Sequence, residues 1–212
     1  DSYLGSKNLI DIFKNKKIKT FLQIGSSLEY GNAPSPQKEV SNCKPKGSYG
    51  LSKLKASKYL KLVGKINNFP FIILRPYQVY GPYQKKNRLI PQTINSCLKN
   101  KKFKCTLGKQ LRDFIYIDDF IILIKKILKT NKPRQEIYNV GSGFPVSVKS
   151  VINKIHNFIK KGNPLYGKIV MRKDEIHSLY PSIQKVKKHF NWHPKYKISS
   201  GIKKTISFYR KN

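Results

Sequence analysis

Acidic side chains are scarce in this sequence. Its 212 residues include 10 Asp and Glu against 44 Lys and Arg, which gives a formal net charge of +34. Such a balance raises the question of a nucleic acid or another polyanion as partner. The lysines, however, are spread along the whole chain, and neither a zinc finger nor an RNA-binding signature is present. We therefore expect non-specific adsorption to polyanions at low salt and no specific nucleic-acid partner.

Cysteines and long apolar runs are also few. Cys43, Cys97 and Cys105 show no paired spacing, which argues against a disulfide framework and against a zinc site, so no metal is expected. No stretch approaches the ~18 uninterrupted apolar residues of a membrane-spanning helix. The N-terminus has no cationic segment followed by an apolar one, as a signal peptide has. These absences predict a cytoplasmic protein without a membrane span.

What is present is an alternation of short apolar strands with longer helices. The predicted strands are 21–24, 71–74, 103–107, 114–116, 137–140 and 168–171. The predicted helices are 2–17, 48–67, 89–99, 118–128, 147–160, 182–190 and 199–209. Such an alternation predicts an α/β fold with a parallel sheet. The ligand site of such a sheet lies beyond the carboxyl ends of its strands.

Three side chains near these strand ends indicate proton chemistry. Ser26 follows the predicted strand 21–24, and Tyr49 and Lys53, four residues apart, share one face of a helix. A free phenol has a pKa near ~10, and a neighbouring cation lowers that pKa. Lys53 supplies the cation, while the Ser26 hydroxyl is placed to bond a reacting oxygen. The set predicts a proton shuttle that accompanies hydride transfer to or from a secondary alcohol.

Taken alone, Tyr-x-x-x-Lys is a weak pattern in a lysine-rich chain with 13 tyrosines, and a surface pair is the alternative. Longer segments add to it, and they resemble one family. These segments are 26–31, 74–82, 87–91, 112–119, 138–143 and 172–175. On these residues the chain resembles the extended short-chain dehydrogenases/reductases of the nucleotide-sugar epimerase/dehydratase family.

The resemblance implies a particular fold. It is a partial Rossmann-like doubly wound parallel sheet followed by a small C-terminal α/β substrate-binding region. Residues 1–82 would hold the second half of the dinucleotide-binding domain, and residues 83–212 mainly the nucleotide-sugar region. Strands near 114–116 and 137–140 would return to the main sheet. The family's Gly-x-x-Gly-x-x-Gly loop is absent and the chain does not begin with Met, so we expect that it starts inside the fold.

The resemblance also implies the site residues, a cofactor (NAD or NADP), a nucleotide-diphospho sugar substrate and a homodimer. The implied catalytic residues are Ser26, Tyr49 and Lys53. The implied cofactor-binding residues are Gly25, Tyr49, Lys53, Arg75, Pro76 and Val79. The implied substrate-binding residues are Ser27, Tyr77, Asn87, Arg88, Arg112, Asn139, Arg172 and Glu175.

The residues after Ser26 bear on the reaction. Dehydratases of the family place acidic residues directly after the catalytic hydroxyl, where this sequence has Ser27 and Leu28. Glu29 comes one residue later, and an extended segment would turn it to the opposite side. We therefore expect a 4-epimerase or a 4-keto-sugar reductase. Less supported alternatives are a catalytically silent nucleotide-sugar-binding remnant, a 4,6-dehydratase and a polyanion-binding protein.

Overall fold

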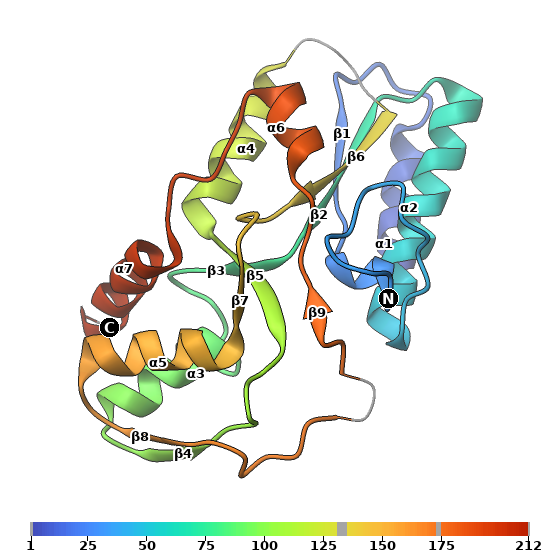
Figure 1. Ribbon diagram of the computed structural model, residues 1–212. Coiled ribbons are helices and arrows are strands. Elements are labelled where there is room, and N and C mark those ends of the chain that lie inside the picture. Colours follow the sequence, from blue (N-terminus) through green and yellow to red (C-terminus); the bar gives the residue numbers. More distant parts are fainter. Residues whose placement is uncertain (1, 131–134, 173–174, 212) are drawn as a thin grey trace.

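Three parallel strands form the sheet around which the rest of the chain is arranged. The computed structural model describes residues 2–130, 135–172 and 175–211. Strands β1 (Phe21–Ile24), β2 (Phe71–Pro76) and β6 (Gln135–Val140) lie in the order β1-β2-β6 (Figure 1). The predicted α/β fold with a parallel sheet is confirmed.

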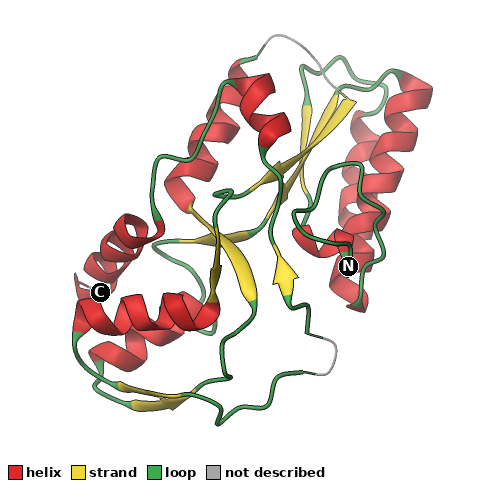
Figure 2. Ribbon diagram, viewed as in Figure 1, coloured by secondary structure: helices red, strands yellow, loops and turns green. Residues whose placement is uncertain are grey.

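Helices cover both faces of this main sheet, as Figure 2 shows. On one face lie α1 (Ser2–Phe13) and α2 (Gly47–Asn67), which pack against each other. On the other lie α4 (Ile117–Lys129) and α6 (Gln184–Phe190). This two-sided cover is the doubly wound arrangement that the sequence predicts.

The central strand β2 is buried on both faces because its side chains alternate. Phe71 and Ile73 join a core cluster with α1 and α2, while Ile72 and Leu74 join a second cluster with α4 and α6. A continuous apolar run is typical of such a central parallel strand.

A second sheet lies beyond the main one. Its central strand is β5 (Leu111–Tyr116), which pairs in parallel with β3 (Gln78–Tyr80) and β9 (Ser178–Leu179) and antiparallel with β7 (Pro145–Ser147). β5 thereby joins segments that are far apart in the sequence.

The remaining elements lie around this second sheet (Figure 1). Helices α3 (Leu89–Leu98), α5 (Val148–Ile159) and α7 (Ile198–Lys211) share a core cluster with residues of β3 and β5. A short parallel pair, β4 (Lys102–Lys104) and β8 (Asn163–Leu165), borders α3 and α5.

The structure differs from the expected helices and strands in three places. The predicted helix 2–17 ends at Phe13. The predicted strand 168–171 is wrong, because these residues pair with no strand in the described part and Val170 is 91% exposed. Residues 78–80, between the predicted strand 71–74 and the predicted helix 89–99, form the unexpected strand β3, which pairs with the distant β5.

Residues 135–140 lie in the main sheet and residues 111–116 in the second sheet. The division of the chain at residue 83 stays a prediction. Across the described ranges, no helix combines the length and the apolarity that crossing a bilayer requires.

At Gly64, helix α2 packs closely against Phe71 of β2. A Cβ added there would lie 2.3 Å from Cε1 of Phe71, whose ring is buried in the core. We predict that Gly64→Ala lowers the free energy of unfolding by about 1–3 kcal/mol through overpacking. Gly5→Ala is the matched control in α1, because a Cβ there meets nothing within 4 Å. It should raise stability by about 0.5–1 kcal/mol. Equal denaturation midpoints for the two variants would contradict this packing.

Candidate active site

The chain makes a tight turn directly after β1. Ser26 caps a single 3-10 turn, Ser27–Tyr30, in which the Ser26 hydroxyl accepts a hydrogen bond from the backbone N–H of Leu28 at 3.1 Å. The backbone N–H of Ser26 donates to Glu29 Oε1 at 2.9 Å, which completes a capping box. The expectation of an extended segment is therefore wrong, because the cap folds the segment back on itself.

The first turn of α2 rests on this 3-10 turn. A Cβ on Gly50 would lie 2.7 Å from the backbone oxygen of Leu28, so only glycine permits the contact. Tyr49, the neighbouring residue, is 54% exposed. Lys53 Nζ lies 5.9 Å from the centroid of the Tyr49 ring and donates at 2.9 Å to the backbone oxygen of Ile24. The predicted proton-handling residues thus gather around the carboxyl end of β1.

A buried ion pair holds the turn from below. Glu29 is 0% exposed and Arg75 is 3% exposed, and Oε2 of Glu29 accepts from Arg75 Nε at 3.0 Å and from Nη2 at 2.8 Å. The Arg75 guanidinium also stacks on the Tyr30 ring at 4.6 Å. Burial lowers the pKa of Arg75, but Glu29, Tyr30 and Cys43 together outweigh it, and the pKa rises above its usual value.

The Arg75 side chain points into the protein toward Glu29 and Tyr30, and through Glu29 it positions the Ser26 turn. Its assignment as a cofactor-binding residue stays a prediction. Gly25 has a related role, because a Cβ there would lie 2.4 Å from Glu29 Oε1.

A buried hydrogen-bond network continues from the ion pair to β6. The Tyr30 hydroxyl donates to Asn139 Oδ1 at 2.7 Å, and Asn139 Nδ2 donates to the backbone oxygen of Gln37 at 2.9 Å. Gln37 Oε1 accepts from the Tyr77 hydroxyl at 2.6 Å. Burial raises the pKa of Tyr30 to about 12 and that of Tyr77 further, so both phenols stay protonated.

The side chains of Tyr77 and Asn139 therefore both form hydrogen bonds inside the protein, although the sequence predicts them as substrate contacts. Their side chains tie the segment after β1 to the ends of β2 and β6. Sequence reasoning missed Tyr30, Gln37 and Glu39, whose carboxylate accepts from the backbone N–H of Asn139 at 2.9 Å. Acidic residues are scarce in this chain, and this scarcity is a signal in the sequence that could have drawn attention to Glu29 and Glu39.

Arg112 and Glu175, both predicted substrate contacts, lie together at the second sheet. Arg112 Nη2 pairs with Glu175, and Nη1 donates to the backbone oxygen of Leu111 at 2.7 Å. Burial lowers the pKa of Arg112, and the Glu175 carboxylate opposes this effect. The next residue, Asp113, accepts from the backbone N–H groups of Ser142 and Gly143 at 2.5 and 2.7 Å, which fixes the turn after β6.

The other predicted residues are more scattered. Asn87 and Arg88 are exposed just before α3, and Arg172 is exposed ahead of β9. Ser27 is buried in the 3-10 turn. Pro76 ends β2 opposite Val140, and Val79 packs from β3 against the core. Among the described residues, no group of three or more His, Cys, Asp or Glu side chains is arranged to hold a metal ion.

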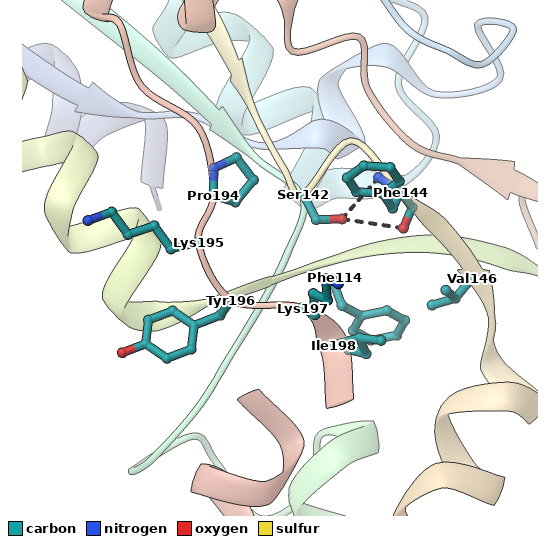
Figure 3. A pocket seen from close by; sticks show the side chains of 9 residues that line it. All are labelled: Phe114, Ser142, Phe144, Val146, Pro194, Lys195, Tyr196, Lys197 and Ile198. Carbon is teal, nitrogen blue, oxygen red and sulfur yellow. Dashed lines mark hydrogen bonds between the residues drawn. The ribbon is translucent and has the colours of Figure 1, made fainter. Parts of the chain in front are cut away.

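A cavity of about 370 Å³ lies between β5, β7 and the segment before α7 (Figure 3). Its lining residues are Phe114, Ser142, Phe144, Val146, Pro194, Lys195, Tyr196, Lys197 and Ile198. None of them belongs to the predicted site, so the cavity does not bear on the chemistry at the end of β1.

Known proteins share both the sequence pattern and the fold. Residues 1–141 match the model of the NAD dependent epimerase/dehydratase family. The chain belongs to this family. Membership confirms the resemblance seen in the sequence.

Individual relatives carry different activities in their names. A dTDP-D-glucose 4,6-dehydratase of Homo sapiens is 29% identical over 98% of this chain and 61% of its own length. A CDP-abequose synthase of Salmonella muenchen is 34% identical over 65% of this chain and 47% of its own length. The chain spans about three fifths of the length of the first curated relatives it matches.

A solved structure of the family confirms the Rossmann-like fold. It is a UDP-glucuronic acid 4-epimerase of Bacillus cereus in complex with UDP-glucuronic acid and NAD. Its TM-score is 0.92 at 25% identity, and the match covers 100% of this chain and 68% of that one.

The buried Glu29–Arg75 pair gives a direct test of the site's construction. Glu29→Gln removes one partner and leaves a cation in the core, so we predict a loss of about 3–5 kcal/mol in the free energy of unfolding. Glu136→Gln is the control, because Glu136 pairs with Lys185 near the surface. It should cost less than about 1 kcal/mol. Chemical denaturation of both variants measures the difference, and similar losses would show that the buried pair does not hold the turn.

Proposed function

We propose that this chain carries the proton-handling and sugar-binding part of a nucleotide-sugar enzyme. The enzyme transfers a hydride at a sugar carbon without expelling water, as a 4-epimerase or a 4-keto-sugar reductase. The observation that supports this most is the gathering of Ser26, Tyr49 and Lys53 at the end of β1 with no free carboxylate beside them. The absence of a free carboxylate holds for the described residues. The carboxylate of Glu29, which lies in the same turn, is bound to Arg75.

The hydrogen bonds at Ser26 and Lys53 suit this chemistry. The Ser26 hydroxyl already accepts a backbone N–H, so its own proton is free to be donated to a sugar oxygen. Tyr49 is exposed, and Lys53 Nζ lies 5.9 Å from the centroid of its ring, so the Tyr49 hydroxyl is open to a bound sugar next to a cation. Tyr49 would then take the proton of the sugar hydroxyl, or return it, while Ser26 holds the oxygen.

The residues fit one end of a dinucleotide. Lys53 and Tyr49 offer a cation and a hydroxyl of the kind that hold a ribose, next to the exposed side chains of Ile24 and Leu28. NAD or NADP, when bound, supplies or accepts the hydride. The Gly-x-x-Gly-x-x-Gly loop that cradles a pyrophosphate is not in these 212 residues. Pro76 and Val79 remain proposed contacts of the nicotinamide end.

The sugar nucleotide would be held mainly by Arg112. A diphosphate is a better partner than Glu175 for a guanidinium that is largely desolvated, and it would take over part of that pairing. The exposed Asn87, Arg88 and Arg172 would complete the approach to the diphosphate, and Ser27 would line the sugar end.

Dehydration is less supported by these side chains. It needs a group that removes a proton beside the ketone and a group that protonates the departing hydroxyl. The position after Ser27 is Leu28, and Glu29 is fully buried and bound to Arg75 and to the Ser26 backbone. The dehydratase relatives therefore support the substrate class proposed here more than they support the reaction.

A second function, nucleotide-sugar binding without catalysis, follows from the missing glycine loop. We predict that the 212-residue chain binds NAD no more tightly than millimolar, because its sequence does not contain the Gly-x-x-Gly-x-x-Gly loop that cradles a pyrophosphate. Isothermal titration calorimetry measures this directly. A micromolar dissociation constant would contradict the prediction and would favour catalysis by the chain alone.

Tyr49→Phe tests the proposed proton carrier. In the longest polypeptide that the gene encodes, the variant should lose about 10²–10⁴-fold in turnover, because general acid–base catalysis contributes that much. Its dissociation constant for the nucleotide sugar should change less than about threefold. Turnover of nucleotide sugars followed by NMR, with cofactor absorbance in parallel, separates epimerisation from net consumption of the reduced cofactor. Retained turnover in the variant would exclude Tyr49 from the role.

A homodimer through α1 and α2 is part of the proposal. Leu9 and Ile12 of α1 and Leu62 and Ile66 of α2 are exposed apolar side chains on this helix pair. Such side chains are typical of a surface that another chain covers.

A further inference from the structure

A second cavity, of about 420 Å³, lies between α2, the start of β6 and residues 39–43. It does not include Ser26, Tyr49 or Lys53, and it opens on another stretch of α2. Arg75 forms part of its wall, whereas Glu29 and Tyr30 do not. The guanidinium therefore separates the cavity from the turn that carries Ser26.

One edge of this guanidinium is unused. Arg75 donates to Glu29 through Nε and Nη2, and Nη1 has no hydrogen-bond partner among the described residues, although the Cys43 thiol and the Tyr30 hydroxyl lie near the guanidinium. Arg75 lines the cavity and Glu29 does not, so the edge of the guanidinium turned away from Glu29 is the one nearer the cavity. A buried charged donor without an acceptor is costly, so it points to an acceptor that completes it.

A second unused donor lies on the same wall. Ser57 of α2 is 1% exposed, lines the cavity, and its hydroxyl has no hydrogen-bond partner within the described part of the chain. Two residues with an unused buried donor, one from β2 and one from α2, thus line the same cavity.

The charges around the cavity favour a negative occupant. Lys58 and Lys61 line it from α2, and Lys185 lines it from α6. The two acidic residues of the wall are already bound: Glu136 pairs with Lys185, and Glu39 accepts from the backbone of Asn139. Arg75, Lys58 and Lys61 are left as the cations that can face a ligand.

We propose that this cavity binds a small oxyanion, either free phosphate or the phosphate group of a metabolite. Its oxygens would accept from Arg75 Nη1 and the Ser57 hydroxyl, and Lys58 and Lys61 would balance its charge. Both donor atoms are covered in this structure, so the anion enters with a local movement of residues 39–43, where Val40 and Asn42 are exposed.

An anion bound in this cavity would change the geometry of the Ser26 turn in the candidate active site. The anion and Glu29 would share one guanidinium, and Glu29 holds the backbone of Ser26. An anion that draws Arg75 toward the cavity would loosen the capping box of the Ser26 turn. This consequence rests on the proposed function, whereas binding itself does not.

Binding is tested with two double variants of equal charge on the same helix. Lys58→Ala/Lys61→Ala removes two cavity lysines, and Lys55→Ala/Lys65→Ala removes two exposed lysines of α2 outside the cavity. Titration with inorganic phosphate, and separately with glycerol 3-phosphate, is followed by ³¹P NMR at constant ionic strength set with chloride. We expect saturable binding that is at least about tenfold weaker in the first variant and unchanged in the second.

Ser57→Ala provides a third arm, because it removes a buried hydroxyl without changing the charge. It should weaken phosphate binding by about 2–13-fold while leaving the stability of the anion-free chain equal or higher. Tighter binding of glycerol 3-phosphate than of phosphate identifies an esterified ligand, and equal binding identifies the phosphate group itself. Equal affinities in all four proteins, or binding that does not saturate, would overturn the proposal and leave only the general attraction of a +34 chain for anions.

Discussion

The buried ion pair between Glu29 and Arg75 is the constraint on which the site depends. Taking two charges out of water is expensive, and the cost is offset only where geometry and further hydrogen bonds are good. Here Glu29 has three donors, from Ser26 and from two nitrogens of Arg75, and the guanidinium has the Tyr30 ring beneath it. The same pair requires glycine at position 25, because a side chain there would occupy the space of the carboxylate.

A hydrogen-bond network extends from this ion pair across the main sheet. Tyr30 reaches Asn139 at the end of β6, and Asn139 and Tyr77 both hold Gln37 in the long segment between β1 and α2. Residues that follow β1 and β2 and a residue of β6 therefore fix one another at the edge where the parallel strands end. Substrate groups would meet a surface whose buried polar atoms are mostly satisfied, which is what holds the reacting side chains in one geometry.

The sequence predicted those parts of the molecule that local pattern decides. β1, α3 and the body of α2 follow from apolar runs and helical spacing, and so do the positions of Ser26 after β1 and of Tyr49 and Lys53 on α2. What could not be predicted is non-local. The inward direction of Arg75 depends on Glu29, the strand β3 depends on β5, and the segment 168–171 finds no partner strand in the described part. The expected extended segment after Ser26 failed because a side-chain cap competes with strand geometry.

The hydrogen bond from Lys53 to the backbone oxygen of Ile24 affects the entropy change of ligand binding. A lysine side chain is among those with the most rotational freedom to lose, and this hydrogen bond already restricts Lys53 before any ligand binds. A ribose hydroxyl would present another neutral oxygen acceptor, so the ammonium would exchange one acceptor for a similar one. The hydrogen bond at the end of β1 thus holds the Lys53 ammonium in place before a ligand binds. The entropy cost of ordering this side chain is therefore incurred on folding and not on binding.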